Sequence, residues 1–306
     1  MSSHPLPDGI VLRPADKADA EAMAELMNAV EGPLGGDTET SADDVRHYWT
    51  RSKDMKTWLA ERGGRLVGSL ETFANDDDRL NADMYVHPAV HDTDLARTLL
   101  QISEADALER GLKHVMNGIL QTDVQTTALL EGAGYAPVRH FYRMTIELTH
   151  ETPEPVWPEG FQLAPFELER DGTSVHAVIE EAFESEWGHT PETDEEWHAR
   201  MPNRTGYAPE LWIVVRAGDE VVAVTILDAK RFGMGWIATV AVRPAWRKRG
   251  LGLAMLYEAF RRHYERGETV AGLGVDAQNT TGATRLYERA GMTHAWGATV
   301  YEKELA

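Results

Sequence analysis

The chain has 306 residues, of which 42% are hydrophobic and 26% charged, and its formal net charge is −20 at pH 7. This composition is globular, with length for two domains, and no apolar run approaches the roughly 18 residues of a membrane span. The acidity argues against a broad nucleic-acid surface, and the absence of cysteine excludes disulfides, cysteine nucleophiles and thiolate metal sites. The N-terminal sequence lacks the basic end and apolar core of a signal peptide, so a cytoplasmic protein is expected.

The sequence contains two related halves. Two pairs of segments match at nearly one offset: 85–90 with 241–246, and 129–135 with 286–292. A constant offset predicts a duplicated domain. Segment 150–159 contains three prolines and is typical of a linker. We therefore expect one domain at 1–149 and a second at 160–306.

Hydrophobic patterns in the first half predict alternating strands and helices. Asp16 is placed to cap the first helix, and Arg62-Gly63-Gly64 is a hairpin signal between two strands. The expected strands are 10–13, 56–61, 65–72, 82–86, 114–120 and 135–148, and the expected helices are 17–30, 42–51, 94–108 and 122–132.

The second half repeats this order. The expected helices are 172–184, 193–201, 253–264 and 279–290, and the expected strands are 211–215, 221–228, 237–242, 270–275 and 293–302. Strands interleaved with two early and two late helices predict a mixed, twisted sheet with helices on both faces in each half. The expected fold class is α/β (α+β), as two tandem domains.

The stretch 236–260 combines a strand, a basic turn and a helix. Four cationic side chains fall within 243–249, and Gly250-Leu251-Gly252 precedes the helix. Backbone N–H groups at a glycine-rich helix start form an anion site. In so acidic a chain, this local reversal of charge indicates an anionic ligand. The alternative is a solvated basic turn before an ordinary helix.

The pattern Arg247-x-x-Gly250-x-Gly252 after a strand resembles the acyl-CoA pyrophosphate motif of the GNAT superfamily of N-acetyltransferases. The resemblance implies acetyl-CoA as co-substrate, its pyrophosphate held by the amides of residues 249–252. It also implies that the backbone of residues 240–242 pairs with the pantetheine arm like an added strand. The cofactor-binding residues expected from it are Val240, Ala241, Val242, Arg247, Lys248, Arg249, Gly250, Leu251, Gly252 and Asn279.

The first half serves as an internal comparison for this motif. It places His91, Asp94 and Ala96 opposite Arg247, Gly250 and Gly252. A carboxylate there repels phosphate, and Asp92 is able to cap the helix with the donors that a phosphate would use. We therefore expect a degenerate first domain that does not bind the cofactor. The same comparison indicates that the fold alone does not demand the arginine and the glycines.

Two further residues of the second half match the family pattern. Asn279 is expected to cap the last helix, and the resemblance adds contact with the pantetheine or pyrophosphate region. Tyr287 follows on that helix, where the pattern alone favours a core residue. The resemblance implies a general acid that gives its proton to the departing CoA thiolate. The first half has Thr122 and Leu130 at these positions.

The segment 180–196 is the best place to seek a general base. It has eight carboxylates and no lysine or arginine, and two tryptophans lie within or beside it. Such a lining suits a cationic amine, whereas the plain alternative is a solvated acidic helix end. Glu186 is our first choice for the base, Glu184 the second, and His189 a third by its near-neutral pKa.

The function implied is transfer of an acetyl group to a primary amine of a small, cationic molecule. A neutral amine would attack directly in a ternary complex, with the oxyanion near the backbone N–H groups of residues 240–242. The alternatives are a non-catalytic acyl-CoA-binding or sensing protein and a protein or peptide N-acetyltransferase. The tandem layout resembles mycothiol synthases, although residues 91–96 depart from their pattern, so that substrate is not inferred. A monomer or a homodimer fits the sequence.

Overall fold

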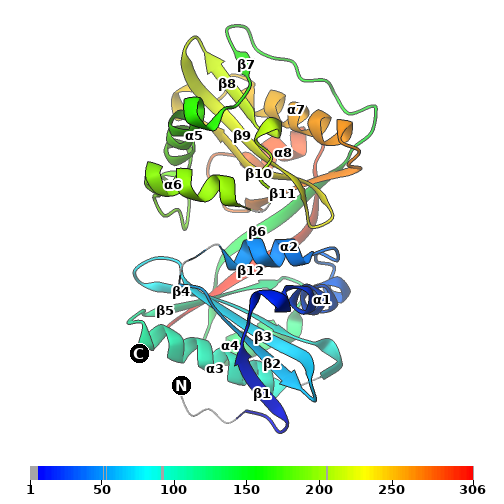
Figure 1. The fold of residues 1–306 in the computed structure, drawn as a ribbon, viewed down its shortest axis with the longest axis vertical. Helices are drawn as coiled ribbons and strands as arrows, with labels where there is room; N and C mark the ends of the chain where they lie inside the picture. Colours follow the sequence, from blue (N-terminus) through cyan, green and yellow to red (C-terminus); the bar gives the residue numbers. More distant parts are fainter. Residues whose placement is uncertain (1–5, 51, 53, 91–92, 205, 306) are drawn as a thin grey trace. The chain divides into compact units, whose positions relative to one another are not determined.

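The computed structural model describes all residues except 1–5, 51, 53, 91–92, 205 and 306. The chain forms two compact units (Figure 1). The N-terminal unit contains Met1–Phe141 together with Trp296–Ala306, and the C-terminal unit contains Tyr142–Ala295. No helix in the described part of the chain has the length and apolar character needed to span a bilayer.

The strands of the N-terminal unit follow the order β1-β2-β3-β4-β5-β12, with the first part of β6 next to β12. The pairs from β1 through β12 in this order are antiparallel except the parallel pair of β4 and β5. Asp16 caps the 3-10 turn that leads into the first helix, as the sequence predicts. The elements are β1 (Ile10–Pro14), α1 (Ala20–Glu31), α2 (Ala42–Trp49), β2 (Lys56–Arg62), β3 (Arg65–Ala74), β4 (Arg79–Val86), α3 (Thr93–Glu109), β5 (His114–Leu120), α4 (Val124–Gly132) and part of β6 (Ala136–Glu147) and of β12 (Thr293–Glu304).

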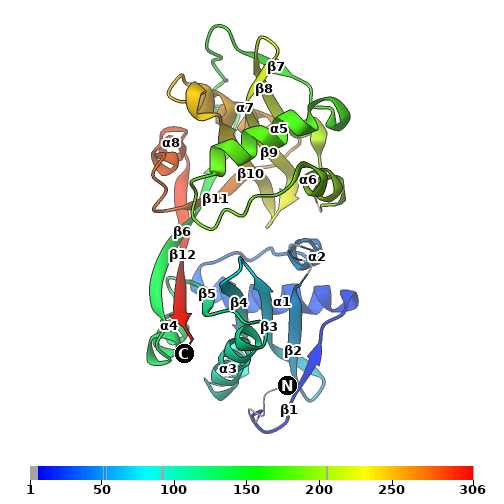
Figure 2. The ribbon, with the colours of Figure 1, turned by 90° about the vertical axis from the view of Figure 1, so that its left-hand side faces the viewer.

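The C-terminal unit has the sheet order β6-β11-β10-β9-β8-β7, in which β10 and β11 are parallel. Helices α5 and α6 cover one face of this sheet, and α7 and α8 cover the other (Figure 2). A mixed sheet flanked by helices in each half confirms the predicted fold class. The elements are β7 (Gln162–Ala164), α5 (Leu168–Phe183), α6 (Asp194–Arg200), β8 (Ile213–Ala217), β9 (Glu220–Arg231), β10 (Met234–Val242), α7 (Leu251–Glu265), β11 (Val270–Asp276) and α8 (Ala283–Arg289).

The two units exchange strand segments. From Tyr142 onward β6 belongs to the C-terminal unit, where Met144 joins the core. From Trp296 onward β12 belongs to the N-terminal unit, where it pairs antiparallel with β5. The domains expected at 1–149 and 160–306 describe the repeat in the sequence, whereas each compact unit borrows a segment from the other half.

The N-terminal unit buries a carboxyl group in its sheet. Glu71 on β3 is 1% exposed, lies opposite Asp83 on β4, and accepts a hydrogen bond from the Trp49 indole. Burial raises the pKa of Glu71 to about 8, and the negative charge of Asp83 adds to the shift while the Trp49 hydrogen bond opposes it. The folded unit therefore prefers this carboxyl group protonated.

We expect Glu71→Gln to stabilise the protein more at pH 8 than at pH 5. The folded-state pKa lies above the unfolded value, so the stability that protonation confers at low pH is lost as the pH rises toward 8. Glutamine removes this loss, with a gain about 1–3 kcal/mol larger at pH 8. Urea unfolding at both pH values measures it, with Glu25→Gln on the exposed face of α1 as the control. An equal effect at both pH values would contradict the assignment.

Candidate active site

The central strands of the C-terminal unit diverge. Among the described residues, β10 and β11 pair only at Gly235 with Ala271 and at Trp236 with Gly272. Beyond this point β10 continues to Val242 with its other edge bound to β9, across a bulge near Ile237. The edge of β10 that faces β11 is therefore open along residues 238–242, and its backbone groups are available to an extended ligand.

The turn between β10 and α7 exposes a row of backbone amides. Lys248 and Gly250 have positive φ values of 62° and 88°, and α7 follows with fifteen residues. In the described structure no acceptor contacts the backbone N–H groups of residues 248–253. The first N–H groups of a helix lack intrahelical partners and carry the positive end of its dipole. This arrangement has the donors that a phosphate group requires.

The Arg247 side chain holds the turn in place. Its guanidinium donates to the carbonyl oxygens of Val242 at 3.1 Å and of Ala182, near the end of α5, at 3.0 Å. Lys248 and Arg249 are exposed beside it, and the Arg249 guanidinium lies 4.8 Å from the Trp246 ring centroid. Arg247 therefore orders the loop, and Lys248 and Arg249 supply exposed positive charge.

The glycines of the motif have packing roles as well. A Cβ atom on Gly252 would lie 2.8 Å from Leu286 Cδ2 on α8, and the left-handed φ of Gly250 disfavours other residues. The inference that the fold does not demand these glycines is therefore wrong for the second half. In the first half, Asp94, the counterpart of Gly250, lies in the first turn of α3 and is not among the described residues with a positive φ.

In the first half a helical turn replaces the amide-rich loop. Helix α3 already begins at Thr93, so that Asp94 lies within its first turn and pairs with Arg97 at 3.0 Å. Its counterpart Gly250 lies ahead of α7. The predicted roles of His91 and Asp92 fall outside the described residues. The Asp94 carboxylate in the first helical turn of α3 supports the interpretation that the first domain has lost the phosphate-binding turn.

Three predicted site residues in the C-terminal unit are connected by a hydrogen bond and a charge effect. Tyr287 on α8 is 8% exposed, and burial raises the pKa of its phenol to about 12, with a further contribution from the negative charge of Glu186. Glu186 lies in the loop after α5, and its Oε2 accepts a hydrogen bond from Asn279 Nδ2 at 2.9 Å. Segments far apart in the sequence thus place a carboxylate, an amide and a phenol near one another.

Asn279 does not cap the last helix, and that prediction is wrong. Helix α8 begins at Ala283, after Gly282 with φ 83°. Asn279 lies earlier, in the turn after β11, where its Oδ1 accepts from the backbone N–H of Thr281 at 2.8 Å. The glycine at 282 breaks the helical pattern, because a left-handed residue does not continue a helix.

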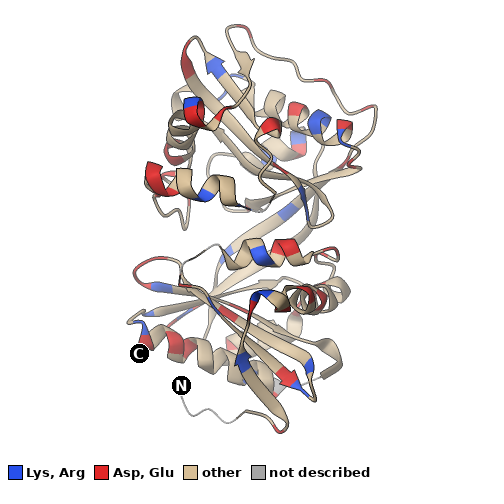
Figure 3. Cartoon of the chain, in the orientation of Figure 1, with Lys and Arg blue, Asp and Glu red and all other residues tan. Residues whose placement is uncertain are grey.

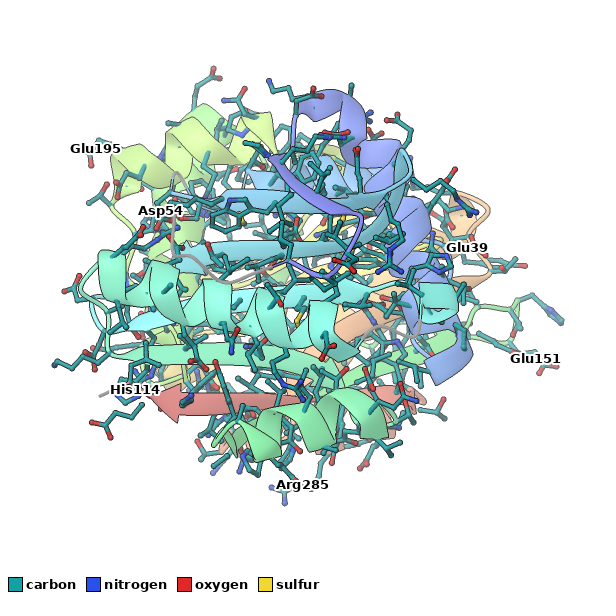
Figure 4. All side chains as sticks on the ribbon, turned by 90° about the horizontal axis from the view of Figure 1, so that it is seen from below. Glu39, Asp54, His114, Glu151, Glu195 and Arg285 are labelled. Atoms are coloured by element: carbon teal, nitrogen blue, oxygen red, sulfur yellow. The ribbon has the colours of Figure 1, made fainter. Side chains whose placement is uncertain are left out.

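Among the described residues, the other candidates for the general base form no hydrogen bond with Asn279 or Tyr287. Glu184 is exposed at the C-cap of α5, and His189 Nε2 is 3.1 Å from Glu180 Oε2. Acidic residues form the first turn of α6, and Glu195 points outward from it (Figures 3 and 4). Part of the acidic segment is thus a solvated helix start, and Glu186 is the candidate base that contacts the Asn279 amide.

The predicted linker contributes contacts that sequence reasoning missed. A Cβ atom on Gly250 would lie 3.5 Å from Pro158 Cγ, so the linker passes close to the glycine turn. Phe161 packs edge-to-face on Trp246 with ring centroids 5.6 Å apart. Trp157 within the segment and Phe161 just after it, which both pack against the hydrophobic core, were the available signal.

The comparisons with known proteins identify the family of the chain. The family model described as acetyltransferase (GNAT) family matches residues 22–135 and again 173–292. The chain is 29% identical over 292 residues to a mycothiol acetyltransferase of Thermobispora bispora, covering 90% of this chain and 92% of that protein. It is 28% identical over 241 residues to the mycothiol acetyltransferase of Pseudarthrobacter chlorophenolicus, covering 75% and 72%.

Solved structures share the complete fold. A GCN5-related N-acetyltransferase from Sphaerobacter thermophilus superimposes with a TM-score of 0.83 at 31% identity, covering 98% of this chain and 97% of that one. A tandem GNAT protein from the clavulanic acid biosynthesis pathway has a TM-score of 0.74 at 14% identity, covering 96% and 98%. With both halves matched by one acetyltransferase model, the chain belongs to the GNAT family and carries its domain twice.

Proposed function

We propose that the protein transfers an acetyl group from acetyl-CoA to a primary amine of a small, cationic molecule. The chemistry would take place in the second GNAT domain by direct attack in a ternary complex. The observation that carries the proposal is the hydrogen bond between Asn279 and Glu186, whose charge also acts on Tyr287, in a unit where β10 has an open edge. The first domain, with Asp94 in a helical turn, would serve as a scaffold.

The second domain has suitable groups for each part of acetyl-CoA, which supplies the acetyl thioester. Amides of residues 248–253 and the exposed charges of Lys248 and Arg249 suit the pyrophosphate. The open backbone of Val240 to Val242 suits the amide-rich pantetheine arm. Arg247 would act through the loop that it orders, since its guanidinium already contacts two carbonyl oxygens.

The residues around the reacting atoms would divide the proton transfers between them. Glu186 would accept a proton from the acceptor ammonium, directly or through water, and the neutral amine would then attack the thioester carbon. Backbone N–H groups along residues 240–242 would stabilise the oxyanion. As the C–S bond breaks, Tyr287 would donate its proton to the leaving thiolate, and its raised pKa keeps that proton in place at neutral pH.

The acidic loop supports a cationic acceptor. Glu180, Glu184 and Glu186 lie on the last turn of α5 and the loop that follows it. Two relatives bear the name mycothiol acetyltransferase, which supports a small-molecule acceptor. A screen of acetyl-CoA turnover against polyamines, aminoglycosides, amino acids, amino sugars and basic peptides identifies the class. Transfer to peptides alone would replace the small-molecule proposal, and acetyl-CoA binding without any transfer would favour a sensor.

Gly250→Asp tests the cofactor site. We expect calorimetry to show acetyl-CoA affinity lowered by about 100-fold or more, because a carboxylate beside bound phosphate is repelled. Gly267→Asp is the matched control, since Gly267 has φ 89° and open space around it but follows the far end of α7. Both variants impose the same backbone strain. Equal loss of affinity in both, or unchanged affinity in Gly250→Asp, would argue against the site.

A further inference from the structure

The side-chain amide of Asn279 is used by the protein itself. Nδ2 donates to Glu186 Oε2 at 2.9 Å, and Oδ1 accepts from the backbone N–H of Thr281 at 2.8 Å. The donor thus points to the loop after α5, and the acceptor stabilises the turn in which Asn279 lies. This differs from the contact with acyl-CoA that the family resemblance implies for Asn279.

The first half contains the same connection with a different partner. Thr122, the counterpart of Asn279, donates through its hydroxyl to the carbonyl oxygen of Leu34. Leu34 and Glu186 each stand three residues past the end of the first long helix of their half, α1 ending at Glu31 and α5 at Phe183. Each half therefore connects the loop after its first long helix to a turn that follows a strand. In the first half this is the turn after β5, and in the second half it is the turn after β11. Only the second half makes this connection through a carboxylate.

The remaining contacts of the loop restrain its backbone. Glu186 N–H donates to the Phe183 carbonyl at 2.8 Å, and His189 N–H donates to the Glu186 carbonyl at 3.2 Å. His189 is also held through its ring by Glu180. These bonds set the position of the main chain, whereas the Asn279 amide sets the direction of the Glu186 carboxylate. The negative charge of that carboxylate also contributes to the raised pKa of Tyr287, so the two groups interact electrostatically.

We infer that Asn279 is a positioning residue, which aims the Glu186 carboxylate at the acceptor amine beside Tyr287 and does not bind acyl-CoA. The inference rests on the proposed function for the role of Glu186. The inference makes the loop after α5 and the turn after β11 act together in placing the Glu186 carboxylate. Both halves contain a hydrogen bond between this loop and this turn, and in the second half the loop residue that forms it is the proposed base, Glu186.

Asn279→Asp is the appropriate variant, because aspartate has nearly the same shape, keeps the acceptor for Thr281 and loses the donor to Glu186. We expect kcat to fall about 10- to 100-fold from misplacement of the base, with the acetyl-CoA dissociation constant and KM within about twofold of wild type. In an E186Q background the same change should cost no more than about twofold, because the group that Asn279 positions is already gone. Asn203→Asp, which removes a comparable donor bond to the Ala199 carbonyl, is the control.

A second measurement does not depend on activity. Hydrogen exchange of residues 184–190 should be at least about fivefold faster in Asn279→Asp than in wild type, with β11 unchanged. Unchanged exchange in the loop would overturn the inference, as would weakened acetyl-CoA binding with intact kcat, or multiplicative losses in the double variant. An inactive wild type with a loosened loop in Asn279→Asp would instead keep the positioning role and refute the proposed reaction.

Discussion

Tyr287→Phe is expected to lower kcat by about 10²- to 10⁴-fold, the range that loss of a general acid produces. Phenylalanine fills the same space in the core of the C-terminal unit, so folding and acetyl-CoA affinity should be retained. Because burial raises the pKa of Tyr287 to about 12, the wild-type acid stays protonated through pH 10, and its ionisation should not lower kcat below that pH. Steady-state kinetics between pH 6 and 10 measure both effects.

Tyr257→Phe provides the matched control for this substitution. Tyr257 lies on α7 and packs against the same hydrophobic core. Among the described residues, no hydrogen bond or ring contact joins it to the loop that contains Glu186. We expect Tyr257→Phe to keep kcat within about threefold of wild type. A Tyr287→Phe variant with the activity of this control would show that Tyr287 is only a core residue, which is the plain interpretation of its helical position.

Truncation after Ala295 is expected to disrupt the N-terminal unit. The removed segment pairs residue by residue with β5 from Ala298 to Glu304, and it includes Tyr301, which is 7% exposed in the core of that unit. It also carries the partners of Arg79 and Glu104 in ion pairs of 3.0 and 2.9 Å. Loss of these contacts should cost more than about 4 kcal/mol, a large part of the roughly 5–15 kcal/mol that stabilises a domain.

Hydrogen exchange of β5 measures this loss directly. In the truncated protein we expect β5 to lose its protection, and a synthetic peptide of residues 293–305 added in excess should restore it by mass action. β8 and β9 of the C-terminal unit serve as internal controls, because their hydrogen-bond partners remain in the truncated chain. Undiminished protection of β5 without the peptide would mean that β12 adds little to the N-terminal unit.

The sequence predicts the elements and the duplication well but does not predict their partners. Alternating residues in β6 and β12 indicate strands, and this pattern is identical whether a strand pairs within its own half or with the other. The exchange of segments at Tyr142 and Trp296 therefore has no counterpart in hydrophobic periodicity. The start of α8 at Ala283, later than expected, could have been predicted, because glycine at position 282 disfavours a continuous helix from Asn279.

The candidate site divides in a similar way. The basic, glycine-containing turn indicates Gly250, and the run of carboxylates indicates Glu186, whereas Tyr287 follows only from the family resemblance. The direction of a side chain depends on its tertiary neighbours. The sequence alone could not show that the Arg247 guanidinium turns back to carbonyl oxygens, or that the Asn279 amide reaches Glu186.

The exchanged strand also sets the order of events during synthesis. The ribosome completes residues up to Phe141 long before it reaches Trp296, and at about 5–20 residues per second the delay is roughly eight to thirty seconds. Throughout that interval β5 has its neighbour β4 but lacks β12, so its other edge is open, the kind of surface on which chains aggregate. The N-terminal unit therefore acquires its last strand segment only after the second half of the chain has been translated.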